Sequence, residues 1–380
     1  MPAMPRAFEQ PLYVTRPLVP PMAEFQQELA AVWESGWFAN GGACHAKLES
    51  ELGQYLGAPH FSLFNNGTIA LVTACRALRL SGEVITTPFT FPATPHVLSW
   101  NNITPVFADI DAVSLTLDPA SVVPLITART TGILAVHVYG VPCDVEGLQR
   151  VADEYGLKVI YDGAHAFGTT IDGKPIAQFG DATMFSFHAT KLFHTAEGGG
   201  LAVSDPALKR RIDLLKNFGI KNETEVAMPG INGKMNEVQA ALGLVVLRHI
   251  EAERAARAGV ANVYEQRLGG LPGVSVVRQP ANVRNSMQYF VIRVAEKEAP
   301  LSRDQLYHRL REFNVFARRY FYPLCSEYSC YRSDPGASPV NLPRATRAAA
   351  EVLALPFFGG LGSDGAARVC EIVEYLFANG

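Results

Sequence analysis

The stretch Phe185-Ser186-Phe187-His188-Ala189-Thr190-Lys191 (residues 185–191) decides how this chain is expected to fold. It begins as an apolar run, passes through a serine and ends at a lysine, and the glycine run Gly198-Gly199-Gly200 follows. A short apolar run next to glycines is typical of a buried β-strand that ends at a turn. We therefore expect a strand that ends near Ser186 and a loop that carries Lys191.

Other short apolar runs repeat this pattern and alternate with amphipathic helical stretches. Strands that alternate with helices predict an α/β fold, in which helices cover both faces of a mostly parallel sheet of largely seven strands. The expected strands are Phe61–Phe64, Val84–Thr87, Pro105–Ala108, Gly132–His137, Leu157–Tyr161, Met184–Phe187 and Leu201–Val203. The expected helices of this part are 22–36, His45–Tyr55, Thr68–Leu80 and Glu146–Tyr155, the last one capped by Asp144.

The pattern changes after a polar loop at residues 220–233. A long helical stretch from Met235 to Leu268 follows and is expected to bridge two domains. Strands and helices then no longer alternate regularly, which predicts a smaller α+β domain. We expect a large domain over residues 1–250 and a small one over residues 251–380. The strands expected beyond the bridge are Val274–Val277 and Tyr289–Val294, and the helices are Ser302–Glu312, Arg344–Leu353 and Asp364–Phe377.

Composition excludes several classes of function. The chain has 380 residues, is 48% hydrophobic and carries a net charge of −3, so it lacks the basic footprint of a nucleic-acid-binding protein. No apolar run reaches the roughly 18 residues that a membrane span needs. The start, Met1 to Arg6, lacks the features of a secretory signal, so we expect a cytoplasmic protein. The six cysteines form no CxxC pair, which argues against a disulfide framework and a metal site.

Polar residues follow several of the expected strands. Ligands bind at the carboxyl ends of strands in parallel sheets, so these residues are expected to meet at one edge. Gly67 and Thr68 open a helix, and a helix N-terminus with a glycine suits a phosphate group. Ser186 is a second candidate for a phosphate ligand. Lys191 lies among aromatic residues and glycines, where desolvation would lower its pKa and make it nucleophilic.

The remaining residues point to one cofactor. Asp162 follows the run Val159-Ile160-Tyr161, and a buried carboxylate there needs a partner such as a protonated pyridine nitrogen. His165 would lie near the same ring, and Phe91 could stack on it. A lysine that forms a Schiff base, a serine for the phosphate and an aspartate for the ring nitrogen are what pyridoxal 5'-phosphate (PLP) requires.

Each of these residues also has an ordinary interpretation. Gly67-Thr68 could be a simple strand-to-helix turn, Asp162 a helix cap or ion-pair partner, and His165 and Phe91 core residues. Lysine is most often a solvated surface residue. Their common position at successive strand ends favours PLP binding over the separate interpretations.

The same motifs resemble the DegT/DnrJ/EryC1/StrS family of nucleotide-sugar aminotransferases, which are fold-type I PLP enzymes of the aspartate aminotransferase type. The resemblance spans nearly the whole chain. Two positions depart from the more usual pattern: Gly163 replaces an alanine, and Phe91 replaces the Trp of some members. The stretches that carry the resemblance are Phe38–Gly42, Asn66–Thr68, Pro105–Asp109, Asp162–His165, Ser186–Lys191, Gly230–Met235 and Arg318–Pro323.

The resemblance implies a role for each matching residue. Lys191 would bind the cofactor and carry protons, Asp162 would pair with the ring nitrogen, and His165 would lie near the 3-oxygen. Phe91 would cover the ring. The phosphate would be held by Gly67, Thr68 and Ser186, and by Asn232 of a second subunit, which implies a homodimer with shared active sites. The substrate candidates are Asn40, Arg318, Tyr320 and Tyr322.

The reaction implied is transamination of a nucleotide-linked 4-keto-6-deoxy sugar. Within the family, the motifs resemble the branch that converts dTDP-4-keto-6-deoxy-D-glucose to dTDP-4-amino-4,6-dideoxy-D-glucose with L-glutamate as amino donor. A 3-aminotransferase acting on a 3-keto sugar remains an alternative. A PLP-binding regulatory protein without sugar turnover is another. Relatives that catalyse 3-dehydration carry histidine instead of the lysine, so Lys191 argues against that reaction.

Overall fold

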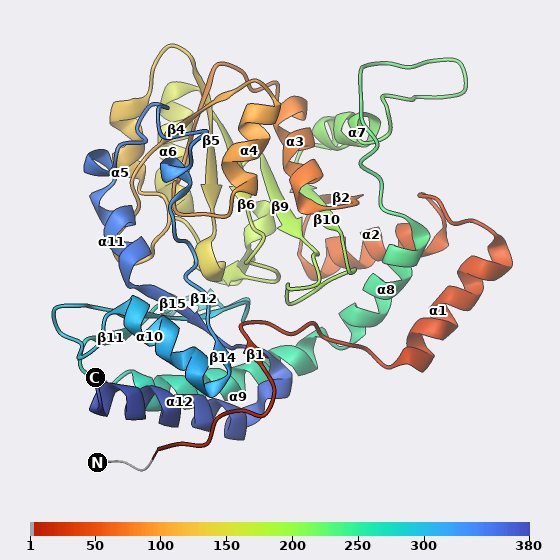
Figure 1. Cartoon of the computed structure of the whole chain (residues 1–380). Coiled ribbons are helices and arrows are strands. Elements are labelled where there is room, and N and C mark those ends of the chain that lie inside the picture. The colour runs from red at the N-terminus through yellow and green to blue at the C-terminus, as the bar shows by residue number, and fades with distance from the viewer. Residues whose placement is uncertain (1–3) are drawn as a thin grey trace.

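The central element of the molecule is a seven-stranded sheet in the order β2-β10-β9-β6-β5-β3-β4 (Figure 1). The computed structural model describes residues 4–380, so residues 1–3 of the stretch that argued against a secretory signal lie outside it. Strand β10 runs antiparallel to both of its neighbours, and the other pairs are parallel. The predicted mostly parallel sheet is therefore confirmed. Its strands are β2 (His60–Phe64), β3 (Glu83–Thr86), β4 (Thr104–Phe107), β5 (Thr130–Val136), β6 (Lys158–Asp162), β9 (Ala182–Ser186) and β10 (Gly199–Val203).

Helices cover both faces of this sheet, which explains why its strands are nearly continuous apolar runs. Leu134 and Ile160 face one layer of helices, and Ile133 and Val159, their chain neighbours, face the other. The first layer contains α3 (Gly67–Ala77), α4 (Ala93–Trp100) and α7 (Pro206–Leu215). The second contains α2 (Ala43–Tyr55), α6 (Val145–Tyr155) and α8 (Glu237–Arg248), with α1 (Met22–Ser35) against α8 and the short α5 (Pro119–Val122) against α6.

The expected single helix from Met235 to Leu268 is wrong. It is two helices, α8 and α9 (Ile250–Leu268), separated at His249, where φ is −100° and ψ is 0°. No glycine or proline marks this break. It coincides with contacts to α1, because His249 Nε2 lies 3.0 Å from Glu24 Oε1 and Arg248 pairs with Glu28. Helix α4 was not predicted, and of α7 only the surface residues Lys209 to Arg211 were expected to be helical.

The C-terminal part forms its own layer on a three-stranded antiparallel sheet, β11-β13-β15. Helices α9 and α12 pack against each other and enclose a second core with this sheet. The helix expected over Arg344–Leu353 is too long, because it ends at Glu351 and the apolar run that follows is a strand. The elements are β11 (Val274–Val276), β13 (Phe290–Val294), β15 (Val352–Leu355), α10 (Arg303–Arg309), α11 (Pro343–Glu351) and α12 (Gly362–Ala378).

Two small sheets cross the expected boundary near residue 250. Strand β1 (Leu12–Tyr13) pairs in parallel with β14 (Val315–Phe316), so the N-terminal strand lies on the C-terminal part. Strand β12 (Val283–Arg284) pairs with β7 (Thr170–Ile171), which in turn pairs with β8 (Lys174–Pro175). A shared apolar cluster, which includes Phe89, Tyr139 and Phe321, lies where the two parts meet. The division at residue 250 stays a prediction.

Candidate active site

A cavity of about 300 Å³ lies at the carboxyl ends of β6 and β9. Seven of the residues singled out in the sequence line it together: Gly67, Thr68, Phe91, Asp162, His165, Ser186 and Lys191. Residues from the C-terminal part, Tyr289, Tyr320 and Phe321, complete its wall. The strand-end argument from the sequence therefore predicted where these groups meet.

Lys191 stands in a segment without helix or strand, between the end of β9 and the start of β10. Burial lowers the pKa of Lys191 to about 8, while the nearby charge of Asp162 opposes part of this decrease. An amine with such a pKa is substantially neutral near pH 8, and the neutral form is the nucleophile. The geometry thus gives Lys191 the property that attack on a carbonyl needs.

Asp162 ends strand β6 and is 4% exposed. Its Oδ2 accepts a hydrogen bond from Thr94 Oγ1 at 2.9 Å, and its Oδ1 accepts one from the backbone N–H of Ala164 at 3.0 Å. Burial raises the pKa of Asp162, and these two donors and Lys191 counteract the increase. A carboxylate held in this way offers its charge to a cationic group in the cavity.

His165 is held in one tautomer. Its Nδ1 accepts a hydrogen bond from the backbone N–H of Tyr139 at 3.2 Å, so the proton of a neutral ring lies on Nε2. Burial places the pKa of His165 well below its usual value, and the ring is therefore neutral. Phe321 stacks on it with centroids 6.0 Å apart, and Tyr289 meets it edge-on at 4.9 Å. His165 can donate one hydrogen bond from Nε2 without carrying a charge.

The first turn of α3 lies directly against the end of β9. Asn66 caps this helix, because its side chain accepts from the N–H of Ile69 at 2.8 Å. A Cβ at Gly67 would lie 2.9 Å from Met184 Sδ and 3.2 Å from Ser186 Cβ, so only glycine allows this close approach. The free N–H groups of the helix start and the Ser186 hydroxyl thus border the same end of the cavity, as a phosphate site requires.

Gly163 and Phe91, the two departures from the family pattern, have different surroundings. A Cβ at Gly163 would lie 2.8 Å from the carbonyl oxygen of Met184, which accounts for glycine after Asp162 in this chain. Phe91 is 59% exposed although it lines the cavity. Its ring therefore has a free side that a planar ligand could cover.

Several residues that line the cavity or contact its lining were missed in the sequence. Thr94, which bonds to Asp162, gives no signal beyond its place after Phe91. Glu197 precedes the glycine run, and its Oε1 lies 3.5 Å from His188 Nε2 at the wall of the cavity. Tyr289 and Phe321 come from a different part of the chain, and no pattern in the sequence links them to Lys191.

Four predicted residues do not line this cavity. Asn232 is exposed, and it follows the loop between α7 and α8 that extends away from the sheet (Figure 1), at a point where its backbone pairs with Asn217. The carbonyl of Asn40 accepts from Trp37 Nε1 at 3.0 Å, and Arg318 pairs through its backbone with Ala354. The assigned roles of Asn40, Asn232 and Arg318 stay predictions, and of the substrate candidates only Tyr320 lies at the cavity.

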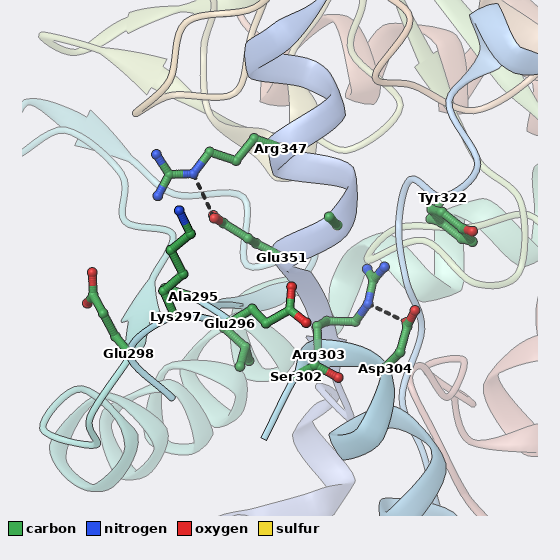
Figure 2. Close-up of a pocket in the computed structure, with 12 residues that line it drawn as sticks. Ala295, Glu296, Lys297, Glu298, Ser302, Arg303, Asp304, Tyr322, Arg347 and Glu351 are labelled. Atoms are coloured by element: carbon green, nitrogen blue, oxygen red, sulfur yellow. Dashed lines mark hydrogen bonds and ion pairs between the residues drawn. The ribbon is translucent and has the colours of Figure 1, made fainter. Parts of the chain in front are cut away.

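Tyr322, the fourth, lies on another cavity of about 660 Å³, shown in Figure 2. Four of its charged groups form two pairs, whereas Glu296, Lys297 and Glu298, which also line it, form no ion pair among the described residues. Arg303 Nε donates to Asp304 Oδ1 at 2.7 Å, and Arg347 Nε donates to Glu351 Oε1 at 2.7 Å. The role of Tyr322 in substrate binding stays a prediction.

Residues 4–380 lack two features that would indicate other functions. No group of three or more His, Cys, Asp or Glu side chains among them could hold a metal ion. In the same residues, no helix is both long and apolar enough to cross a membrane.

Comparison with known proteins gives matches over nearly the whole chain. Residues 21–374 match the model of the DegT/DnrJ/EryC1/StrS aminotransferase family. A dTDP-4-amino-4,6-dideoxy-D-glucose transaminase of Shigella dysenteriae is 44% identical over 97% of this chain and 98% of its own length. The crystal structure of DesI in the presence of its TDP-sugar product superposes with a TM-score of 0.94 at 38% identity, covering 99% of this chain and 95% of DesI.

One relative is named as a sensory protein and not as a transaminase. The erythromycin biosynthesis sensory transduction protein EryC1 of Saccharopolyspora erythraea is 33% identical, over 91% of this chain and 93% of its own length.

Proposed function

Because the chain belongs to the DegT/DnrJ/EryC1/StrS aminotransferase family, we propose that it is a PLP-dependent transaminase of dTDP-4-keto-6-deoxy-D-glucose. The product is dTDP-4-amino-4,6-dideoxy-D-glucose, and L-glutamate supplies the amino group. The observation that carries the proposal is the partly buried amine of Lys191 in one cavity with the buried carboxylate of Asp162. The relative of Shigella dysenteriae, matched along nearly its whole length, supports the choice of sugar.

The cavity fits PLP group by group. The N-terminus of α3 with Gly67, Thr68 and Ser186 would hold the phosphate, and the tight approach at Gly67 keeps this cradle open. Asp162 would pair with the ring nitrogen, His165 would donate from Nε2 to the 3-oxygen, and Phe91 would cover the ring. When bound, PLP supplies an electron sink for the carbon that gains or loses the amino group.

The protein supplies binding, proton transfer and exclusion of water. Lys191, with its pKa of about 8, can both accept and donate a proton near neutral pH, as transfer to and from the substrate carbon requires. Asp162 would favour a protonated ring nitrogen, because a buried carboxylate is stabilised by a cation beside it. The rings of Tyr289, Tyr320 and Phe321 shield the part of the cavity beside His165 from water.

The enzyme works as a homodimer with shared active sites in this proposal. Both the diphosphate of the sugar nucleotide and the carboxylates of glutamate need cationic partners, and arginine is the side chain best suited to them. Among the described residues, no arginine lines the cavity. Asn232 is exposed and does not line the cavity of its own chain, which supports a role for it in the cavity of a second subunit. The second subunit therefore contributes to each site.

A substrate panel tests the proposal. The purified protein is incubated with PLP, L-glutamate and a series of nucleotide sugars that includes the 4-keto and 3-keto isomers of dTDP-6-deoxyglucose. We expect rapid formation of 2-oxoglutarate with the 4-keto sugar and a product with nitrogen on C4, located by NMR. Amination of the 3-keto isomer instead would reassign the reaction. A protein that PLP does not colour would contradict enzymatic function and favour a regulatory role.

A further inference from the structure

The loop that carries Lys191 is tied to a segment almost a hundred residues away in the sequence. The side-chain amide of Gln288, which is 2% exposed, forms both contacts. Its Oε1 accepts from the backbone N–H of Leu192 at 2.7 Å, and its Nε2 donates to the backbone carbonyl of Thr190 at 3.0 Å. The two hydrogen bonds therefore bracket Lys191 on both sides.

The residues next to Gln288 contact His165. Ser286 Oγ donates to the carbonyl oxygen of His165 at 2.6 Å, and Ser286 is fully buried. Tyr289 places the edge of its ring on the imidazole. We call residues 285–289 the strap. It runs between β12 and β13 and touches both the lysine loop and the histidine of the cavity.

Helix α9 holds the strap from the other side. Arg257, which is fully buried, donates from Nη1 to the carbonyl of Met287 at 3.0 Å, and its Nε pairs with Glu253 Oε1 at 2.6 Å. Arg254 donates to the carbonyls of Asn285 and Ser286. These bonds join the strap to α9 at three backbone carbonyls.

We propose that Gln288 is a positioning residue for Lys191, acting through the backbone of Thr190 and Leu192. The inference rests on the proposed function. Residues 187–198 contain no helix or strand, and the two bonds from Gln288 add to the loop's own backbone bonds, such as that from the N–H of Lys191 to the carbonyl of His188. A catalytic group must be held to within about 0.5 Å of its productive place, and a displacement of about 1 Å can cost roughly a hundredfold in rate. Gln288 supplies this restraint from the C-terminal part of the molecule.

Two substitutions distinguish the contributions of the two hydrogen bonds that Gln288 forms. Gln288→Met keeps the length of the side chain and removes both hydrogen bonds. Gln288→Glu keeps an acceptor for the N–H of Leu192, but an ionised carboxylate cannot donate to the carbonyl of Thr190. Gln178→Met is the matched control, because the Gln178 amide donates to the carbonyl of Gly57 at 2.7 Å and does not line the cavity.

The measurements are made on full-length protein, with and without PLP. We expect faster amide hydrogen exchange across residues 188–193 in Gln288→Met, a shifted midpoint in the pH titration of the PLP-dependent visible absorbance, and a kcat that falls at least tenfold while KM changes less. Gln288→Glu is expected to lie between wild type and Gln288→Met. The control loses thermal stability at most and leaves the titration and kcat unchanged.

The outcomes distinguish this inference from the proposed function. A wild-type protein that neither binds PLP nor converts substrate refutes the proposed function. Amide hydrogen exchange at residues 188–193 of the apoprotein still tests whether Gln288 holds the lysine loop in place. Unchanged exchange, titration midpoint and kcat in folded Gln288→Met would overturn the role of Gln288. If that variant does not fold, a folded Gln288→Ala protein, which also lacks both hydrogen bonds, overturns it equally when all three measurements keep their wild-type values.

Discussion

At the scale of single residues, the site depends on two buried ionisable groups that need each other. Burial moves the pKa of Lys191 down and that of Asp162 up, so both groups are pushed towards their neutral forms. Each charge partly opposes the shift of the other. The arrangement keeps the amine reactive and leaves the carboxylate ready for a cationic ligand.

The pH dependence of PLP capture follows from the pKa of Lys191. The neutral amine attacks, so the rate at which the apoprotein binds PLP covalently should rise with pH and level off above a midpoint near 8. Stopped-flow absorbance at several pH values measures this rate. Lys191→Ala should fold and show no covalent capture and no turnover. A midpoint near the ordinary lysine value of about 10.4 would contradict the argument.

The stability of the apoprotein should show that burying the charged form of Asp162 is unfavourable. Because the folded-state pKa of Asp162 is raised, its contribution to stability is present below the unfolded pKa and is lost as pH rises through the folded pKa. Asp162→Asn removes the unfavourable burial of a charged carboxylate, and the amide can still form hydrogen bonds with Thr94 and Ala164. We expect the variant apoprotein to melt at a higher temperature than wild type at neutral pH, with an advantage that disappears in acid, and to lose turnover. A lower melting temperature at neutral pH would refute this.

Sequence reasoning found the members of the site that directly follow strands of the sheet. Gly67, Asp162, Ser186 and Lys191 stand in or beside motifs whose order along the chain matches the order of strand ends. Gln288 and Tyr289 could not be found, because their contacts join segments about 100 residues or more apart and depend on tertiary packing.

At the scale of elements, the junction of α3 with β9 is the most tightly constrained. Gly67→Ala places a Cβ within 3.3 Å of Ser186 and closer still to Met184. We expect this overpacking to cost about 1–3 kcal/mol of stability and to weaken PLP binding, as measured by denaturant unfolding and by PLP titration.

Gly53→Ala in α2 is the matched control for this substitution. Its Cβ would meet only ordinary contacts, the nearest at 3.7 Å, so the helix should gain about 0.5–1 kcal/mol. PLP binding should stay as in wild type. Equal behaviour of the two variants would show that the close approach at Gly67 has no role in holding the cofactor.

The elements also show where local pattern suffices. The seven strands of the main sheet are short apolar runs, and they were located to within two residues or so because burial on both faces leaves a clear signal. The break between α8 and α9 has no such signal, because residues of α1 contact it from elsewhere. The run Val352–Leu355 is apolar enough for either a helix or a strand, and its pairing with β13 makes it a strand.

At the scale of the whole molecule, a mixed dimer tests whether Asn232 acts across subunits. Lys191→Ala and Asn232→Asp are each expected to inactivate the homodimer, the second because a negative charge repels the cofactor phosphate. Dissociation and reassociation of an equal mixture should restore about a quarter of wild-type activity, since half of the dimers are mixed and each has one intact site. If Asn232 acts within its own subunit, no activity returns.

The pairing of β1 with β14 has a consequence for the synthesis of the chain. The strands of the main sheet all lie within residues 60–203, so that sheet can form while the rest of the chain is still on the ribosome. Strand β1 leaves the ribosome before all of them, yet its partner follows only about 300 residues later. During this interval β1 is an unpaired edge. Pro11 directly precedes β1, and Pro17 lies four residues after it. Neither proline has the backbone N–H that pairing with another sheet would need. Both therefore protect the nascent chain against premature pairing and aggregation.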